Sequence, residues 1–358
     1  MTRKKTKIHY PLYPLSILYG LGVRFRNLLF DYEILKSQPY PAAVICVGNL
    51  TVGGTGKTPH IEYLIRLLTP IYKVAILSRG YKRQSKGFVL GDINSTPQLL
   101  GDEPYQLKNK FPQIDVAVDA DRRNGIQQLL QLPSPPQVIL LDDAFQHRYV
   151  KPGLSLLLSD YNRPFYEDAL LPAGRLREGK EGKKRADVII VSKTPASLTN
   201  DAKQQIEKQI APLPGQQVFF SSLHYEPLKP VFEHIATRPL NTASEILLVT
   251  GIARPEIVEK EIARTYRLNE SMVFADHHDF TEADIQKISQ KFKAISNKQK
   301  AIIVTEKDAV RLRHNPHIND YLKENMYFLP LEIVFLHNET NRFNQIILDY
   351  VAENQRHS

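Results

Sequence analysis

The stretch Ala-Ala-Val-Ile-Cys-Val-Gly-Asn-Leu-Thr-Val-Gly-Gly-Thr-Gly-Lys-Thr-Pro-His spans residues 42 to 60 and decides how the rest of the chain is interpreted. Its first part, Val44 to Val47, is a short apolar run rich in β-branched residues, which predicts a buried strand. Its second part, Thr51 to Thr58, places three glycines directly before Lys57 and Thr58. Glycines let the backbone turn its N–H groups inward, and a helix that starts there adds its dipole, so this part predicts a phosphate-binding loop.

Each position of this loop has an expected part in nucleotide binding. We expect Lys57 to contact the β- and γ-phosphates and the hydroxyl of Thr58 to bind Mg²⁺. The predicted cofactor-binding residues are Thr51, Val52, Gly53, Gly54, Thr55, Gly56, Lys57 and Thr58. The loop departs from G-x-x-x-x-G-K-[ST], because Thr51 stands where the first glycine belongs and the nearest upstream glycine is Gly48. A glycine-rich turn without a ligand is the alternative, and the order of strand, glycine loop, Lys-Thr and helix argues against it.

The composition indicates a soluble globular protein of one large domain or two ordinary ones. The chain has 358 residues, of which 42% are hydrophobic and 24% are charged. The net charge of +9 fits an anionic partner, which could be nucleic acid, a phosphorylated substrate or an acidic membrane surface. Cys46 is the only cysteine, so no disulfide can form within the chain, and a reducing compartment fits.

The N-terminal segment combines apolar and basic residues without the features of a signal peptide. Prolines interrupt its apolar run, no A-x-A cleavage site follows, and the run is shorter than the roughly 20 residues that a membrane-spanning helix needs. From Leu15 to Phe30 the apolar residues recur at helical spacing, with basic residues on both sides. We expect a helix over about residues 10 to 30 that lies on a membrane surface. An ordinary amphipathic helix packed on the domain is the alternative.

Short buried strands alternate with helices along the remaining chain, which predicts a parallel sheet covered on both faces. The predicted fold class is α/β: a P-loop-type domain over residues 1–222, a linker over 223–240, and a second, smaller α/β domain over 241–358. The second domain lacks a glycine-rich phosphate loop, so we expect the first domain to bind the nucleotide.

The candidate catalytic residues follow predicted strands, where ligands bind in open α/β sheets. Asp142 and Asp143 end an apolar strand, and such carboxylates are typically aimed at the Mg²⁺ of a bound nucleotide. Asp102 could deprotonate an acceptor, with helix capping as the alternative. His277 could assist a carboxylate or bind phosphate, with an uninvolved loop histidine as the alternative.

Several further residues are candidates for binding an anionic substrate. Three arginines and the basic run from Lys180 to Arg185 could bind anions, although most such charges are simply solvated. The predicted substrate-binding residues are Arg79, Tyr81, Glu103, Arg122, His147 and Arg177.

The assembled motifs resemble those of the tetraacyldisaccharide 4′-kinases, the lipid A 4′-kinases of Gram-negative bacteria. The resemblance rests on Val47 to Pro59, Ser78 to Tyr81, Gly101 to Pro104, Leu141 to His147, Leu171 to Gly174, Leu176 to Glu178, Asp276 to His278 and Thr305 to Asp308. It spans nearly the whole chain. Two local departures are Ala144, where the family often has glycine after the Asp pair, and Gly179, where it often has proline.

The resemblance implies two α/β domains joined by a two-stranded linker, with an N-terminal membrane-associating helix. It implies ATP and Mg²⁺ as cofactors, an acylated glucosamine disaccharide 1-phosphate as acceptor, and no nucleic-acid partner. It implies Asp102 as the catalytic aspartate, assisted by His277 and Lys57, and a metal site of Thr58, Asp142, Asp143 and Glu178. The implied location is peripheral, at the cytoplasmic face of the inner membrane.

A P-loop ATPase or GTPase that acts as a switch or metallochaperone is the alternative function. Its deviant Walker loop carries a second lysine just before the glycine pair, where this chain has Val52. Guanine selection usually uses Asn-Lys-x-Asp, and the nearest analogue, Ser192-Lys193-Thr194-Pro195, lacks both ends. The kinase interpretation is therefore preferred.

Overall fold

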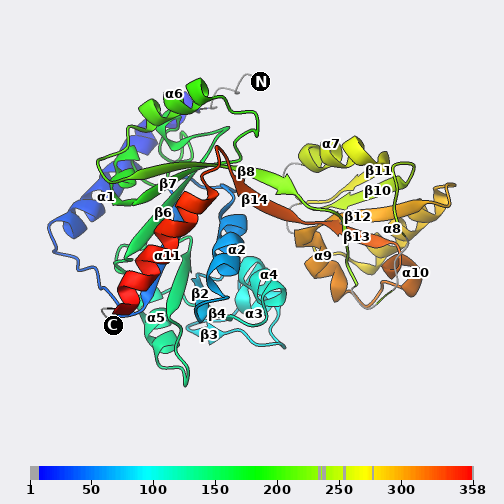
Figure 1. Cartoon of the computed structure of the whole chain (residues 1–358), viewed down its shortest axis with the longest axis horizontal. Coiled ribbons are helices and arrows are strands. Elements are labelled where there is room, and N and C mark those ends of the chain that lie inside the picture. The colour runs from blue at the N-terminus through cyan, green and yellow to red at the C-terminus, as the bar shows by residue number, and fades with distance from the viewer. Residues whose placement is uncertain (1–7, 233–234, 236–238, 253–254, 276–277, 357–358) are drawn as a thin grey trace. The chain divides into compact units, whose positions relative to one another are not determined.

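The computed structural model describes residues 8–232, 235, 239–252, 255–275 and 278–356, which form two compact units (Figure 1). The first unit consists of Met1–Leu223 and Ile333–Ser358, and the second of His224–Glu332. One unit has a large, mostly parallel sheet and the other a smaller sheet, which confirms the predicted α/β fold class.

The first unit is built on a nine-stranded sheet in the order β14-β8-β7-β6-β1-β5-β2-β4-β3. Its strands are β1 (Ala43–Asn49), β2 (Val74–Ser78), β3 (Val89–Leu90), β4 (Asp115–Val118), β5 (Val138–Asp142), β6 (Leu154–Asp160), β7 (Val188–Ser192), β8 (Gln217–Tyr225) and β14 (Leu331–Phe335). All pairs from β4 through β1 to β8 are parallel, and β3 is antiparallel to β4. Strand β1 is buried at every position, as its apolar run predicts for a strand covered on both faces.

Helices cover both faces of this sheet. The described helices are α1 (Tyr13–Asp31), α2 (Lys57–Leu68), α3 (Pro97–Leu100), α4 (Asp102–Lys110), α5 (Arg122–Leu130), α6 (Asn200–Ile210) and α11 (Thr340–Arg356), with short 3₁₀ turns at Tyr10–Leu12, Phe165–Glu167 and Lys180–Arg185. Apolar residues of α2 and α11 join one buried core, and those of α5 and α6 join the core on the opposite face.

The second unit has a five-stranded sheet in the order β11-β10-β12-β13-β9. Its strands are β9 (Lys229–Pro230), β10 (Glu245–Thr250), β11 (Arg267–Val273), β12 (Lys300–Thr305) and β13 (Met326–Leu329), and its helices are α7 (Pro255–Thr265), α8 (Glu282–Ala294), α9 (Glu306–Arg313) and α10 (Asp320–Lys323). The Thr281–Asp284 capping box that starts α8 is present as predicted.

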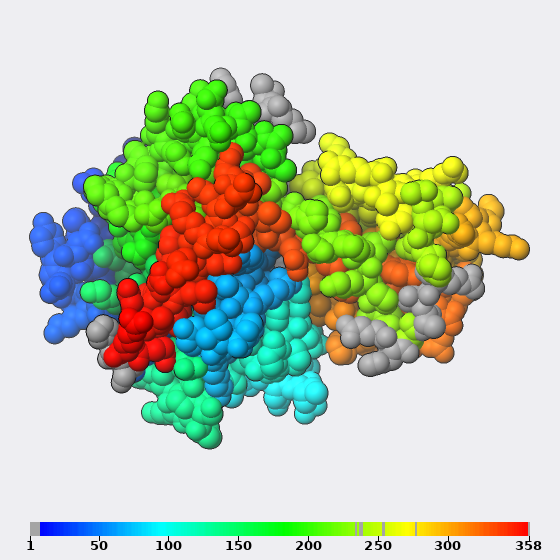
Figure 2. Space-filling model, viewed as in Figure 1, coloured from blue at the N-terminus to red at the C-terminus, as the bar shows by residue number. Residues whose placement is uncertain are grey.

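The end of the chain differs from the expected division into domains. Residues 333–358 belong to the first unit, although the sequence order predicts them in the second domain. The reason is the apolar face of α11, whose Phe343, Ile347 and Val351 are buried in the core beneath α2. Figures 1 and 2 show α11, in red, on the same side of the first unit as α2.

Helix α1 is apolar on its exposed side and attached to the first unit on the other. The exposed apolar residues include Leu15, Ile17, Leu18, Leu21 and Phe25, and Leu18 is 67% exposed. On the attached side Ser16 and Phe30 are buried. The helix is thus packed on the domain on one side, and its association with a membrane surface stays a prediction. Within the part of the chain that the structure describes, no helix is long and apolar enough to cross a membrane.

Candidate functional site

The phosphate loop lies at the point where the sheet's connections change sides. The chain places β2 to β5 on one side of β1 and β6 to β8 on the other. The carboxyl end of β1 is thus a topological switch point, the usual ligand-binding position in such sheets. Helix α2 starts directly after the loop, at Lys57. Gly53 (φ 110°) and Gly56 (φ 84°) adopt backbone conformations that other residues rarely tolerate, so these two glycines shape the loop.

Gly48 does not replace the missing first glycine of the loop. It lies inside β1, where an added Cβ would stand 2.6 Å from the Cβ of Phe145. Gly48 therefore lets the segment after β5 approach β1 closely. At the position where the first glycine is expected, Thr51 forms a β-bridge with Leu176, and the next residue's N–H donates to the Arg175 carbonyl at 2.8 Å.

The Asp pair stands beside this loop, as the sequence predicts. Val47 and Asp142 are register partners in the β1–β5 pair, and the Asp143 N–H donates to the Val47 carbonyl at 3.0 Å. The Lys57 ammonium lies 3.4 Å from Asp143 Oδ1, and Arg177 Nη1 lies 2.9 Å from both carboxylate oxygens of Asp143. The structure therefore joins three residues that are far apart in the sequence into one charged cluster.

The two aspartates have opposite electrostatic surroundings. Burial, followed by the charge of Glu103, raises the pKa of Asp142 to about 7, and only 3% of Asp142 is exposed. Burial alone would raise the pKa of Asp143 as well, but Lys57 and Arg177 outweigh it and hold that pKa below its ordinary value. Asp142 thus has too little positive charge nearby to offset its burial, whereas Asp143 has two cations beside it that do.

Asp142 fits a magnesium ion better than Asp143 does. Its Oδ2 accepts a hydrogen bond from Ser78 at 3.2 Å, while its buried Oδ1 has no hydrogen-bond partner among the residues that the structure describes. A hard cation that takes oxygen ligands would satisfy this atom. Among the residues described, no three His, Cys, Asp or Glu side chains converge on a metal site. An ion here would draw its other ligands from the Thr58 hydroxyl, phosphate oxygens and water.

Glu178, expected as a metal ligand, forms an ion pair and hydrogen bonds with neighbouring side chains. It is buried, and Arg185 Nη2 donates to both of its oxygens at 2.7 Å. Asn27 of α1 and Gln146 also donate to it, at 3.3 and 2.9 Å. Because both oxygens are engaged, we do not retain Glu178 as a metal ligand. The sequence analysis did not assign Gln146 a role, although it lies in the run that follows the Asp pair.

Asp102 opens helix α4 without being its cap. Gly101 occupies the cap position with φ 88°, and an added Cβ there would stand 2.9 Å from the Tyr81 carbonyl oxygen. Capping therefore does not explain Asp102. The neighbouring Glu103 is close enough to Asp142 to raise the pKa of Asp142, so the start of α4 faces the Asp pair.

The expected substrate-binding residues occupy two environments. Arg122 is 3% exposed, and it lies within electrostatic range of Asp142, Asp143 and Arg79. Arg79 and Tyr81 are exposed, and Tyr81 has 72% of its surface accessible. Exposed groups close to a buried charge cluster are suited to a ligand that arrives from solvent.

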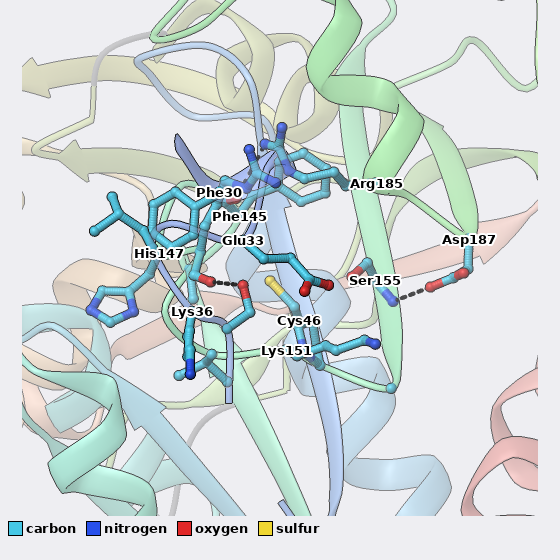
Figure 3. A pocket seen from close by; sticks show the side chains of 17 residues that line it. Phe30, Glu33, Lys36, Cys46, Phe145, His147, Lys151, Ser155, Arg185 and Asp187 are labelled. Atoms are coloured by element: carbon cyan, nitrogen blue, oxygen red, sulfur yellow. Dashed lines mark hydrogen bonds between the residues drawn. The ribbon is translucent and has the colours of Figure 1, made fainter. Parts of the chain in front are cut away.

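His147 is half-buried in the wall of a cavity of about 820 Å³ (Figure 3). Phe30, Cys46, Phe145, Lys151 and Arg185 also line this cavity. Burial, together with the charge of Arg122, lowers the pKa of His147, and its buried Nδ1 has no hydrogen-bond partner in the described part of the chain. His147 is thus a neutral polar group next to the acid-pair loop.

His277 lies outside the described residues. Its neighbour His278 is described, and its Nε2 lies 2.9 Å from Asp284 Oδ2. The expected pairing of Asp102 with His277 therefore stays a prediction.

Comparison with known proteins identifies a family and several relatives that are similar to this chain. The model of a family described as tetraacyldisaccharide-1-P 4′-kinase matches residues 8–352. A tetraacyldisaccharide 4′-kinase of Bacteroides thetaiotaomicron is 50% identical, over 98% of this chain and 96% of the relative. Its counterpart in Flavobacterium johnsoniae is 45% identical, over 96% and 97%. The solved structure of LpxK from Aquifex aeolicus in complex with ATP has a TM-score of 0.75 and 29% identity, covering 96% of this chain and 99% of that one.

Proposed function

Because the chain belongs to the tetraacyldisaccharide 4′-kinase family, we propose how its residues divide the work of that reaction. The enzyme uses ATP to phosphorylate the 4′-hydroxyl of a tetraacyldisaccharide 1-phosphate in lipid A biosynthesis. This activity agrees with the preferred kinase interpretation over the switch or metallochaperone. The assignments below concern the individual residues, the metal and the membrane.

The phosphate loop and Lys57 bind the triphosphate. The backbone N–H groups of residues 53–58 surround the phosphate oxygens, and Lys57 neutralises charge on the β- and γ-phosphates. Asp143 holds the Lys57 ammonium on one side, 3.4 Å away, and Arg177 holds Asp143 on the other. Asp143 therefore positions two cations around the transferring phosphoryl group.

Asp142 and Thr58 would hold Mg²⁺. The unpaired, buried Oδ1 of Asp142 supports this assignment, because a desolvated carboxylate oxygen without a partner is costly. The ion would supply positive charge that offsets the negative charge developing on the phosphoryl group during transfer. Ser78 fixes the rotation of the Asp142 carboxylate through its 3.2 Å hydrogen bond.

Asp102 accepts the proton of the 4′-hydroxyl. It stands at the start of α4, next to Glu103 and thus near the acid pair, and helix capping does not account for it. The family resemblance implies that His277 assists it. Arg79, Tyr81, Arg122 and His147 bind the acceptor's sugar and phosphate groups, and Arg177 holds Asp143 beside the phosphate loop.

Helix α1 places the enzyme at the surface of a membrane. The exposed residues Leu15, Leu18, Leu21 and Phe25 form an apolar side that no other described segment covers. The basic residues around it attract anionic lipid, each contributing about 1 kcal/mol near such a surface. The enzyme is thus proposed to act as a peripheral protein at the cytoplasmic face of the inner membrane, where its lipid acceptor is dissolved.

The observation that carries these assignments is the contact of Arg177 and Lys57 with Asp143, beside the unpaired Oδ1 of Asp142. The test is incubation with ATP, Mg²⁺ and tetraacyldisaccharide 1-phosphate, followed by mass spectrometry for one added phosphate. Asp142→Asn and Asp143→Asn are compared with the wild type at several Mg²⁺ concentrations. Equal Mg²⁺ requirements in all three proteins would contradict the metal assignment.

A further inference from the structure

Three consecutive carbonyl groups of the phosphate loop accept hydrogen bonds from side chains that the nucleotide-binding motif does not include. Lys193 Nζ donates to the Gly54 carbonyl. Ser192 Oγ donates to the Thr55 carbonyl at 2.7 Å, and His60 Nδ1 lies 2.7 Å from the Gly56 carbonyl. The carbonyls of Gly54, Thr55 and Gly56 are therefore each held by a side chain from outside the loop.

This anchoring has a direct consequence for anion binding. In a planar trans peptide unit the C=O and N–H bonds point in opposite directions. Fixing the carbonyls of Gly54, Thr55 and Gly56 away from the site therefore fixes the N–H groups of the following residues toward it. Such aligned N–H groups make a phosphate-binding nest. A loop that holds this arrangement before the nucleotide arrives avoids the entropy cost of forming it during binding.

The sheet itself holds two of the three anchors. Ser192 is fully buried at the end of β7, and it is the register partner of Asp160 at the end of β6. Lys193 follows with φ 56°, and its ammonium lies 2.8 Å from Asp160 Oδ2. The lysine is thus fixed between Asp160 and the loop, and its donation to Gly54 is directed by the strand ends.

The third anchor has a defined protonation state. His60 is 2% exposed, and its Nε2 lies 2.9 Å from Ser221 Oγ of β8. Because a carbonyl oxygen can only accept, Nδ1 carries the proton and Nε2 accepts from the Ser221 hydroxyl. Burial lowers the pKa of His60 to about 4, so the ring is neutral, in agreement with this assignment. Asn49 Nδ2 adds a bond to Thr55 Oγ1 at 2.9 Å.

We infer that Lys193, Ser192 and His60 are positioning residues that preform the phosphate nest of this kinase. They act through the loop backbone and determine its affinity for nucleotides that carry a β-phosphate. This inference rests on the proposed assignment of residues 51–58 as the nucleotide site. A purely structural role would lower the stability of the fold without distinguishing between nucleotides.

The test measures the dissociation constants of the full chain for ATP, ADP and AMP, together with the KM for each substrate. Lys193→Met keeps most of the aliphatic side chain and removes the ammonium. We expect it to weaken ATP and ADP binding roughly tenfold, as for one hydrogen bond from a charged group. The dissociation constant for AMP and the KM for the lipid acceptor should each stay within about twofold of the wild-type value. Lys193→Arg should restore ATP binding in part, and Lys208→Met on the exposed surface of α6 is the matched control.

Ser192→Ala and His60→Asn test the other two anchors. They also provide the test of the inference if Lys193→Met does not fold. His60→Asn retains a donor near the Nδ1 position and loses the bond to Ser221, so it should weaken ATP binding less than His60→Ala. Equal weakening of ATP and AMP, or unchanged ATP binding in the folded anchor variants, would overturn the inference. Lys57→Ala separates the two proposals: if it also binds ATP normally, the nucleotide-site assignment itself is wrong.

Discussion

Arg177 Nη1 lies 2.9 Å from both carboxylate oxygens of Asp143, and this contact joins the Asp pair to the segment that flanks the phosphate loop. The Arg177 N–H also donates to the Leu50 carbonyl at 2.7 Å, and the Tyr19 hydroxyl of α1 donates to the Arg177 carbonyl at 2.7 Å. Arg177 therefore connects the acid pair, the phosphate loop and the proposed membrane helix. Its position allows one residue both to hold Asp143 and to order the segment beside the phosphate loop.

The first prediction concerns the phosphate loop. Lys57→Ala removes the cation over the β- and γ-phosphates, and Thr58→Ala removes a proposed Mg²⁺ ligand. Both should abolish measurable phosphorylation, while circular dichroism and thermal unfolding stay close to the wild type because both groups face the ligand. Kinase activity that persists unchanged in Lys57→Ala would rule out this nucleotide site.

The second prediction separates the two aspartates. Asp143→Asn removes the negative charge that holds Lys57 and Arg177 in place. Turnover should therefore fall roughly 10- to 100-fold, as for groups that orient a site indirectly. Asp142→Asn removes the proposed metal ligand, so it should lose more turnover and recover part of it at high Mg²⁺. Titrating Mg²⁺ in both variants checks this, and recovery of Asp143→Asn alone would reverse the two roles.

The third prediction concerns membrane binding by α1. Deleting residues 1–30 should release the enzyme from membranes, but it also removes Tyr19 and Asn27, which contact Arg177 and Glu178. Leu18→Ser combined with Phe25→Ser is the cleaner change, because both side chains are more than 60% exposed. This double variant should sediment poorly with anionic vesicles while keeping turnover toward an acceptor dispersed in detergent.

A matched change on the exposed side chain of Ile71, in the loop after α2, is the control for the α1 variant. Ile71→Ser should sediment like the wild type. If the α1 double variant also sediments like the wild type, α1 has no part in membrane binding.

The fourth prediction concerns the pH dependence of the second unit. Hydrogen bonds from Thr281, then from His278, lower the pKa of Asp284 to about 2 from an ordinary 3.8. The stabilisation is therefore fully present above about pH 4 and is lost as the pH falls through the folded value near 2. The thermal stability difference between wild type and Asp284→Asn should shrink as the pH is lowered from 6 to 3. A difference that stays constant over this range would mean that the charge of Asp284 does not stabilise the fold.

The sequence alone predicts the features that depend on residues close together in the chain. The buried strand before the phosphate loop, the Asp pair at a strand end and the Thr281–Asp284 capping box are each encoded within a few residues. The parallel α/β class follows from the same alternation of strands and helices.

The features that depend on distant contacts could not be predicted. The amphipathic pattern of α11 predicts a packed helix but not which core receives Phe343 and Ile347. The sequence suggested Glu178 as a metal ligand, and only the fold shows that Arg185 lies 2.7 Å from it. The bonds of His60 and Ser192 to the phosphate loop follow from strand order, which the sequence pattern does not determine.

The central claim is that Asp102 deprotonates the 4′-hydroxyl of the acceptor. The most direct measurement is kcat for Asp102→Ala, made together with the dissociation constant for ATP. Removing a positioned base typically costs about 10²- to 10⁴-fold in rate, so kcat should fall within that range while ATP binding stays nearly unchanged.

The same measurement on His277→Ala and on the double variant tests whether the two residues act as a unit. The loss in His277→Ala should be smaller, and the loss in the double variant should be far less than the product of the single losses. Strictly multiplicative losses would separate His277 from Asp102, and an unchanged kcat in Asp102→Ala would contradict the claim that Asp102 is the base.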